Sequence, residues 1–371
     1  MFKLSKRMET MVGAGLYPDE RYGMACAIPY IEWSRPGKKE SALVLFLTGG
    51  GHLGRISYGY PDGDPRDFLA YWLTLMGYNL VVPSPPIEHP LFNSPVPGLD
   101  ITTWSEVLID LVEAKLQAWK LRPRVLVVGW SMAGRFISRL AATASTRGIT
   151  VEAFVSLAAT PPLPGLSPVN LDETPLSRHG FRSFLGPSGT DALTSVNRSW
   201  LASLSEQDCL EGRSIIPSEV YFKEFVGNSP LNLHGEAHRW RNERMQHSLS
   251  DAAKDVLAME FQGAPLCAAI IPTASSDRHH LLTDQANWSF FNANVIAARA
   301  ASFAPNALDK VRAVVESLPQ RLSREAVGGH FFFVGAKGAR AAAQAILALH
   351  TEALVVESEL KSCSCRDQCE P

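Results

Sequence analysis

The sequence lacks an excess of charge of either sign, and it lacks long apolar runs. Its 371 residues carry 35 lysines and arginines against 37 aspartates and glutamates, which gives a formal net charge of −2. This balance gives no excess of positive charge that would bind nucleic acid or an anionic membrane surface. No stretch reaches the roughly 18 apolar residues of a transmembrane helix, and residues 1–20 contain no apolar signal-peptide core. We therefore expect a cytoplasmic protein that binds neither nucleic acid nor a membrane.

The sequence is also short of cysteine in any arrangement that predicts a metal site. Three of its six cysteines are scattered: Cys26, Cys209 and Cys267. The other three crowd the end of the chain: Cys363, Cys365 and Cys369. Structural zinc sites use four ligands, usually with C-x2-C spacing, so we expect ordinary thiols and no bound metal. A soft metal on the three tail thiolates, or intermolecular disulfides on oxidation, are the alternatives, and residues 356–371 are predicted to form a flexible tail.

One stretch combines a buried strand, a sharp turn and the start of a helix. Residues 125–134 read V-L-V-V-G-W-S-M-A-G, so a run of apolar β-forming residues breaks at Gly129 and presents a single serine, Ser131. A serine in such a turn is lifted clear of the sheet and lies at a helix N-terminus, where unpaired N–H groups favour negative charge. We expect Ser131 to be a catalytic nucleophile. The alternative is a strand-to-helix turn that happens to carry a serine.

This stretch resembles the nucleophile elbow of the α/β-hydrolase superfamily, in which the serine lies in a G-x-S-x-G motif. Gly129 and Ser131 match the motif, Ala133 replaces its second glycine, and Gly134 follows. Small residues are needed there because the strand and the helix nearly touch, so alanine is a mild departure. The resemblance covers roughly residues 40–160 and 264–350.

Strands and helices alternate along much of the chain. Short apolar runs predict buried strands at residues 42–47, 79–82, 125–130, 149–158 and 266–271. Amphipathic stripes between them predict helices. Such alternation predicts an α/β fold with a mostly parallel, doubly wound sheet and helices on both faces, which is also what the α/β-hydrolase resemblance implies. Residues 311–318 are predicted to form the last strand, ahead of a helix over residues 336–349.

The alternation stops between residues 161 and 263. Prolines and glycines open this region, helical patterns follow near residues 191–204, 217–225 and 235–260, and no buried strand run appears. We predict a core domain of residues 1–160 and 264–355, with residues 161–263 inserted as a helical cap that excludes water and shapes the pocket. The basic segment 238–244 is expected to form a solvated helix face. Contact with an anionic substrate group or an acyl carrier is the alternative.

A glycine-rich loop follows the first buried strand. It reads T-G-G-G-H-L-G from Thr48 to Gly54, and consecutive glycines let a backbone approach a ligand closely. In the superfamily this position carries the oxyanion loop, so the resemblance implies an oxyanion hole formed by the backbone N–H groups of Met132 and Gly50. Further substrate contacts are expected at Gly49, Gly51, His52 and Trp130. A plain flexible turn is the alternative, and a phosphate cradle is disfavoured because no G-K-S/T follows.

The acid of a catalytic triad is expected after the strand at residues 266–271. Asp277 lies where the superfamily places this acid, although Ala274 stands where a glycine is usual. Asp284 is the fallback, but it better fits the cap of the next helix. The neighbouring His279 and His280 are expected to line the cleft or its rim.

The base is expected on a glycine turn that precedes the last helix. His330 follows Gly328 and Gly329 there, and by the resemblance it is the third triad member in the order Ser, Asp, His. Such a histidine takes the proton of the serine hydroxyl, and the aspartate holds its imidazole in the right tautomer. A loop histidine packed against Phe331–Phe333 is the alternative.

These residues predict a serine hydrolase that cleaves a carboxylic ester, lactone or thioester and needs no cofactor. An acyltransferase with the same acyl-enzyme is the second hypothesis, and a lyase, cyclase or ligand-binding member of the fold is the third. The apolar neighbours Trp130, Met132 and Phe331–Phe333 favour a small, partly hydrophobic substrate. The expected partner is this small molecule, and a homodimer stays open.

Overall fold

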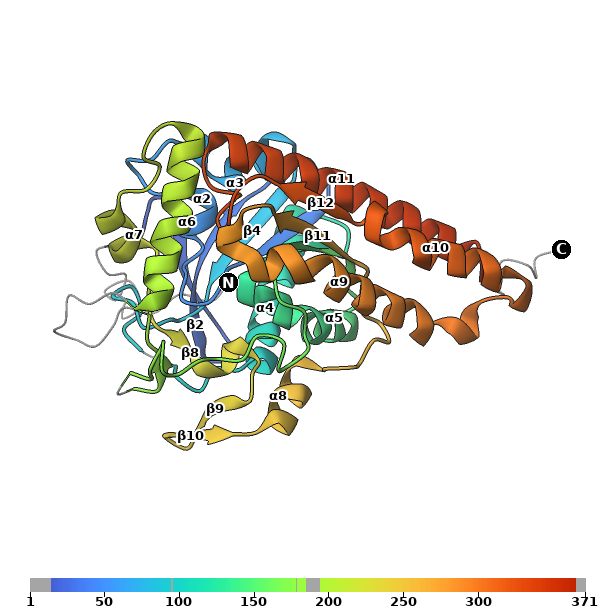
Figure 1. Cartoon of the computed structure of the whole chain (residues 1–371), viewed down its shortest axis with the longest axis horizontal. Coiled ribbons are helices and arrows are strands. Elements are labelled where there is room, and N and C mark those ends of the chain that lie inside the picture. The colour runs from blue at the N-terminus through green and yellow to red at the C-terminus, as the bar shows by residue number, and fades with distance from the viewer. Residues whose placement is uncertain (1–14, 95, 178, 185–193, 365–371) are drawn as a thin grey trace.

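The computed structural model describes residues 15–94, 96–177, 179–184 and 194–364. Its centre is an eight-stranded sheet in the order β1-β2-β4-β3-β5-β6-β11-β12 (Figure 1). Strand β2 runs antiparallel to β1 and β4, whereas the strands from β4 to β12 are parallel to one another. The strands are β1 (Glu20–Ala25), β2 (Ile28–Arg35), β3 (Leu43–Leu47), β4 (Asn79–Ser84), β5 (Arg124–Trp130), β6 (Thr150–Leu157), β11 (Cys267–Pro272) and β12 (Ser323–Ala326).

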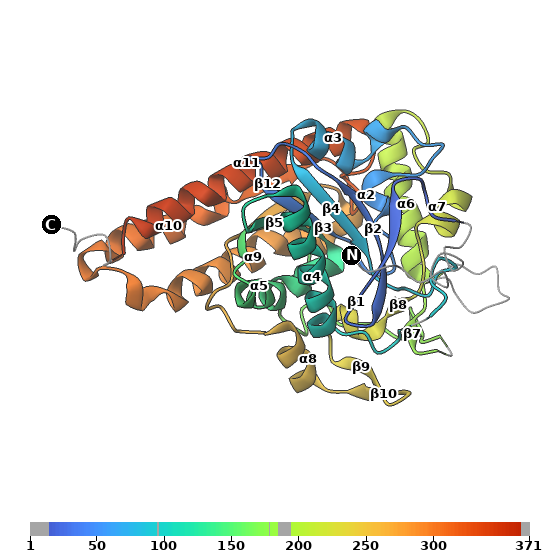
Figure 2. The same ribbon diagram turned by 180° about the vertical axis from the view of Figure 1, so that it is seen from behind.

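Helices cover both faces of this sheet. The long helix α11 (Ala336–Lys361) packs with α3 (Leu69–Leu75) on one face, and α4 (Ile101–Trp119) packs with α5 (Ile137–Thr146) on the other (Figures 1 and 2). Strands β3, β4 and β11 are buried along their whole length, which is why their sequences are nearly continuous apolar runs. The predicted doubly wound, mostly parallel α/β architecture is therefore confirmed.

The last strand is not where the sequence pattern placed it. Residues 311–318 belong to helix α10 (Leu308–Arg321), which extends beyond the sheet together with α9 (Arg278–Ala298) and α11 (Figure 1). Val311, Val314 and Leu318 are its buried residues, and their spacing is helical. The last strand is β12, a short edge strand with two exposed residues. Its sequence, Ser-Arg-Glu-Ala, carries no apolar signal because one side of the strand has no neighbour.

Between β6 and β11 the chain leaves the sheet. This segment contains helices α6 (Ser195–Glu211), α7 (Ser218–Glu224) and α8 (Leu249–Val256), and two small antiparallel sheets. These sheets pair β7 (Phe181–Arg182) with β8 (Ser229–Pro230), and β9 (His238–Arg241) with β10 (Arg244–His247).

The prediction of a helix over residues 235–260 is thus wrong in its first half. Asn242 and Glu243 adopt positive φ angles of 50° and 56°, which produce a tight hairpin between β9 and β10 in place of a helix. Among the described residues, no helix combines the length and the apolar character needed to cross a membrane.

A buried carboxylate ties this segment to the core. Asp255 at the end of α8 accepts hydrogen bonds from the backbone N–H groups of Ile101 (3.3 Å) and Thr102 (2.8 Å) at the start of α4. The same carboxylate pairs with Arg239 of β9 at 2.6 Å, and both side chains are at least 96% buried. Asp255 thereby joins the hairpin, α8 and a core helix.

We therefore expect Asp255→Asn to lower the free energy of unfolding by about 3 kcal/mol, because it leaves the Arg239 guanidinium buried without its counter-charge. Urea unfolding followed by circular dichroism measures this loss. The matched control is Asp251→Asn, which removes an exposed pair with Arg241 and is expected to cost less than about 1 kcal/mol. Equal losses in the two variants would contradict the assignment of Asp255 as the anchor.

Candidate active site

Ser131 lies at a strained turn at the carboxyl end of β5. Its φ angle is +57°, in the left-handed region that a residue with a side chain rarely occupies. A short 3-10 helix, Ser131–Phe136, follows at once and continues as α5. Such strain costs on the order of 1–3 kcal/mol, and strained residues cluster at active sites, ligand clamps and switch regions.

Close packing around the turn explains its small residues. A Cβ atom on Gly134 would lie 2.3 Å from the carbonyl oxygen of Thr160, and the N–H of Thr160 donates to the carbonyl oxygen of Ser131 at 3.0 Å. Ala133, which replaces the second glycine of the motif, is fully buried, so a methyl group is accommodated there. The turn is therefore clamped against the segment that follows β6.

The glycine loop lies beside this turn. Strands β3 and β5 are parallel neighbours, with Leu47 opposite Gly129, so the segments that follow them leave the same edge of the sheet. A Cβ on Gly49 would lie 3.0 Å from the Cβ of Ser131, and Gly51 has a φ of +72°. Only glycine fits the loop at these two positions without strain or displacement of a neighbour.

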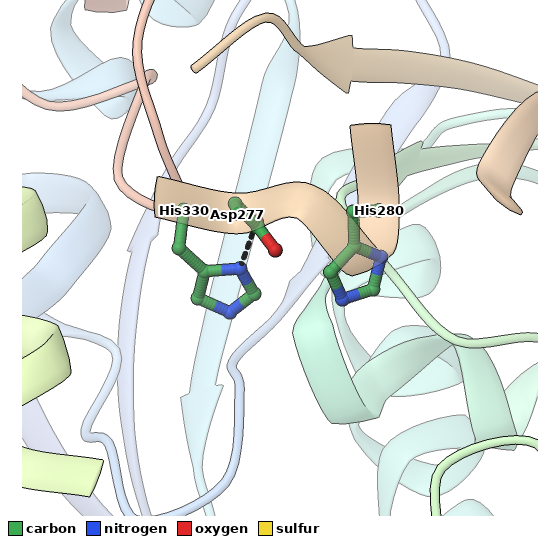
Figure 3. A group of neighbouring side chains, drawn as sticks. All are labelled: Asp277, His280 and His330. Carbon is green, nitrogen blue, oxygen red and sulfur yellow. Dashed lines mark hydrogen bonds and ion pairs between the residues drawn. The ribbon is translucent and has the colours of Figure 1, made fainter. Parts of the chain in front are cut away.

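Asp277 and His330 are brought into contact by the pairing of β11 with β12. Asp277 ends a 3-10 turn after β11, and His330 lies in the loop after β12. The Nδ1–H of His330 donates to Oδ2 of Asp277 at 2.7 Å (Figure 3). Burial alone would raise the pKa of Asp277, but the facing imidazole outweighs burial and lowers the pKa to about 2. Asp277 is therefore ionised at neutral pH.

The His330 loop is also held against the Ser131 turn. Nε1 of Trp130 donates to the carbonyl oxygen of His330 at 3.0 Å, and the two ring centroids are 5.3 Å apart. No hydrogen bond joins the Ser131 hydroxyl to His330 among the described residues. Such contacts are often long in unliganded enzymes and tighten in the substrate complex, and the Nε2 atom of His330 is the one that Asp277 leaves unbound.

A second histidine–aspartate pair stands next to the first. Nδ1 of His280 donates to Oδ1 of Asp284 at 2.8 Å, and the imidazole rings of His280 and His330 are 5.4 Å apart (Figure 3). Burial alone would lower the pKa of His280, but the Asp284 carboxylate outweighs burial and raises the pKa. The fallback acid Asp284 therefore contacts His280, as part of helix α9, and not His330.

Asp277, His280 and His330 have the residue types of a metal site. One ligand atom from each lies within 4.8 Å of the others, and two histidines with one carboxylate bind divalent metals in other proteins. In this protein Nδ1 of each histidine already donates to a carboxylate. A carboxylate on Nδ1 leaves Nε2 of each histidine open, which suits a metal-bound histidine as well as a proton-transferring one.

A cavity of about 170 Å³ opens beside the serine. Gly50, Ser131 and Met132 form one part of its wall, and Phe184 and Trp200 form an aromatic part. The remaining wall consists of the apolar Val196 and of six polar residues: Arg135, Thr160, Ser167, Arg182, His234 and His280.

Four of the expected substrate contacts do not line this cavity: Gly49, Gly51, His52 and Trp130. His52 is 1% exposed and hydrogen-bonds to the Tyr221 hydroxyl at 2.7 Å, and burial lowers its pKa to about 3. Trp130 is also 1% exposed and packs in the core with Phe331 and Phe333. The apolar residues that favoured a hydrophobic substrate are therefore core residues, apart from Met132.

Eight residues of the cavity wall were not expected from the sequence, and three of them can carry a charge: Arg135, Arg182 and His234. Arg182 and His234 come from the inserted segment, where no motif marks them. The basic segment that was singled out there, residues 238–244, forms the β9–β10 hairpin, and its buried Arg239 pairs with Asp255. None of its residues lines the cavity described above.

The strand order and the places of these residues define the class of fold. When the eight strands of the central sheet are numbered 1 to 8 along the chain, their order across the sheet is 1-2-4-3-5-6-7-8. Strand 2 runs antiparallel to both of its neighbours. A serine turn follows the fifth strand, an aspartate the seventh and a histidine the eighth. This is the α/β-hydrolase fold that the motif implied.

No protein-family model matches the sequence, and no curated protein is similar to it in sequence. An esterase from Pyrobaculum calidifontis is 14% identical over 94% of this chain and 89% of its own, with a TM-score of 0.43. Cfl2 from Burkholderia cenocepacia is 12% identical over 88% of this chain and 93% of its own, with a TM-score of 0.45. The thioesterase domain from the curacin biosynthetic pathway is 14% identical over 88% and 98%, with a TM-score of 0.38. Likenesses of this size say nothing about substrate or reaction.

We expect dialysis against EDTA to leave the rate of p-nitrophenyl acetate hydrolysis unchanged, because the reaction expected from the sequence, attack by Ser131 with His330 as base, needs no metal. The measurement compares treated and untreated protein, each with and without added zinc. A loss of rate that zinc restores would show that Asp277, His280 and His330 hold a functional metal.

Proposed function

We propose that this protein is a serine hydrolase that cleaves a carboxylic ester, lactone or thioester through an acyl-enzyme on Ser131. The observation that carries the proposal is the left-handed φ of +57° at Ser131. A non-glycine residue is held in this conformation only when the surrounding structure imposes it. Here Ser131 lines a cavity next to a glycine loop, and the adjacent Trp130 hydrogen-bonds to the backbone of His330, which pairs with Asp277.

In the proposed first step, Nε2 of His330 takes the proton of the Ser131 hydroxyl as Oγ attacks the substrate carbonyl. Nδ1–H of His330 remains bonded to Asp277, which fixes the tautomer and stabilises the imidazolium that forms. Because the pKa of Asp277 is about 2, its carboxylate stays charged throughout.

The tetrahedral intermediate carries an oxyanion, for which we assign the backbone N–H groups of Met132 and Gly50 as donors. Both residues line the cavity with Ser131. Each such donor contributes about 10²- to 10³-fold in rate in measured enzymes. His330 then returns its proton to the leaving group, and water, deprotonated by the same imidazole, releases the acyl group from Ser131.

Ser131→Ala is expected to lower kcat for ester hydrolysis by about 10⁴- to 10⁶-fold, because it removes the nucleophile. A fluorophosphonate probe is expected to label the wild-type chain at Ser131, which mass spectrometry of the digested protein locates. Undiminished hydrolysis by the variant, or no labelling of a folded wild-type protein, would end the assignment and favour a ligand-binding or non-hydrolytic role.

Asp277→Asn is expected to lower kcat by about 10⁴-fold, because an amide in place of the carboxylate stabilises the wrong tautomer of His330. Asp284→Asn is the matched control in the neighbouring pair, and its effect is expected to be much smaller because Asp284 contacts His280. Steady-state kinetics on one chromogenic ester measures both variants. A larger loss from Asp284→Asn would place the acid of the reaction on the second pair.

A further inference from the structure

Arg182 lines the cavity, and no carboxylate of the described residues pairs with it. Its Nε donates to the Thr174 hydroxyl at 2.7 Å, and its Nη1 donates to Nδ1 of His234 at 3.1 Å. Its guanidinium carbon lies 5.0 Å from the centre of the Phe184 ring. These contacts fix the orientation of the guanidinium, while Nη2 donates to no group among the described residues. Burial lowers the pKa of Arg182 to about 10, so it remains a cation at neutral pH.

Three arginines that are more deeply buried than Arg182 each pair with a carboxylate. Arg55 pairs with Glu20 and Glu224, and Arg239 pairs with Asp255. Arg135, which lines the same cavity, is 2% exposed and pairs with Glu236. Because burying a cation without a counter-charge is costly, these pairs are the expected arrangement. Arg182 is only partly buried, and the described residues hold it by neutral partners, Thr174 and His234.

The described part of the cavity wall offers Arg182 no negative charge. Among the described residues that line the cavity there are two arginines and two histidines but no aspartate or glutamate. Glu173 is the acidic residue whose charge raises the pKa of Arg182. Its side chain is exposed and does not line the cavity. The charge of Arg182 is therefore open to an anion that enters from the cavity.

His234 connects Arg182 to the serine side of the cavity. Since a guanidinium only donates, Nδ1 of His234 accepts and the proton lies on Nε2. This Nε2 has no hydrogen-bond partner within the described ranges, although the side chain is 93% buried. A Cβ atom on Gly50 would lie 2.7 Å from Cε1 of His234, so the ring packs directly on the oxyanion loop. One imidazole ring thus separates Gly50 from Arg182.

We propose that Arg182 binds a carboxylate at the end of a short acyl chain, so that the substrate is a monoester or thioester of a small dicarboxylic acid. This inference rests on the proposed acyl-enzyme and narrows its substrate class. With the scissile carbonyl at Ser131 and its oxygen near Gly50, the acyl chain runs past His234, and its terminal carboxylate receives the free N–H groups of Arg182. The small cavity limits the chain to a short one.

The test compares monoethyl succinate with ethyl levulinate, which has the same chain length but a neutral methyl ketone in place of the carboxylate. The wild-type protein is expected to prefer the succinate ester. Arg182→Gln is expected to lower kcat/KM for monoethyl succinate by about 10- to 100-fold, which is the contribution of a charged hydrogen bond. It should leave kcat/KM for ethyl levulinate nearly unchanged.

Two further variants separate recognition from structure. Arg182→Lys keeps the positive charge and is expected to retain part of the preference for the acidic ester. Arg241→Gln alters an exposed arginine outside the cavity and should leave the preference intact. Equal losses on both esters in Arg182→Gln would show that Arg182 only supports the fold. A wild-type protein that favours ethyl levulinate would overturn the proposal.

A binding measurement keeps this inference distinct from the proposed function. Succinate titrated calorimetrically into the Ser131→Ala protein is expected to bind, and Arg182→Gln in the same background should abolish binding. If succinate binds but the fluorophosphonate does not label wild-type Ser131, the anion site is supported and the hydrolase proposal is overturned. Labelling and cleavage of ethyl levulinate, without succinate binding, would overturn the anion site alone.

Discussion

The left-handed backbone of Ser131 is the constraint on which the site depends. A conformation that costs on the order of 1–3 kcal/mol persists only if neighbouring interactions hold it. Strand β5 is paired on both sides, with β3 and β6, and the Thr160 N–H donates to the Ser131 carbonyl oxygen. A relaxed turn would carry the hydroxyl away from the glycine loop and the histidine loop. The buried sheet therefore maintains the geometry of the candidate nucleophile.

The chemistry and the selectivity of the proposed enzyme come from different parts of the chain. The residues proposed for catalysis follow strands of the central sheet, whose register fixes their separation. Arg182 and His234 belong to the segment between β6 and β11, which is joined to the core by Asp255 and by the pairing of Arg135 with Glu236. The inserted segment can therefore vary in its cavity-lining residues without disturbing the sheet that carries the chemistry.

Sequence patterns predicted the fold correctly where a segment's apolar residues have the spacing of the element that it forms. The buried strands β3, β4, β5 and β11 are recognisable because both faces of each are covered by helices. The pattern failed at β12, a polar edge strand, and at residues 311–318, where the apolar residues follow a helical period. It also failed at the β9–β10 hairpin. The turn residues Asn242 and Glu243 have positive φ angles, and the turn contains no glycine that would have predicted them.

The sequence by itself determined the α/β architecture, the turn at Ser131 and the three candidate residues. Ser131 and Asp277 each follow a recognisable buried strand, whereas His330 was identified by the glycine turn ahead of the last helix, because β12 has no apolar pattern. Only the tertiary structure decided which of these side chains touch. Asp277 and His330 are 53 residues apart, and Arg182 and His234 are 52 residues apart, yet each pair shares a hydrogen bond. Contacts at such separations depend on strand order and on the path of the inserted segment, and neither leaves a periodic signal in the sequence.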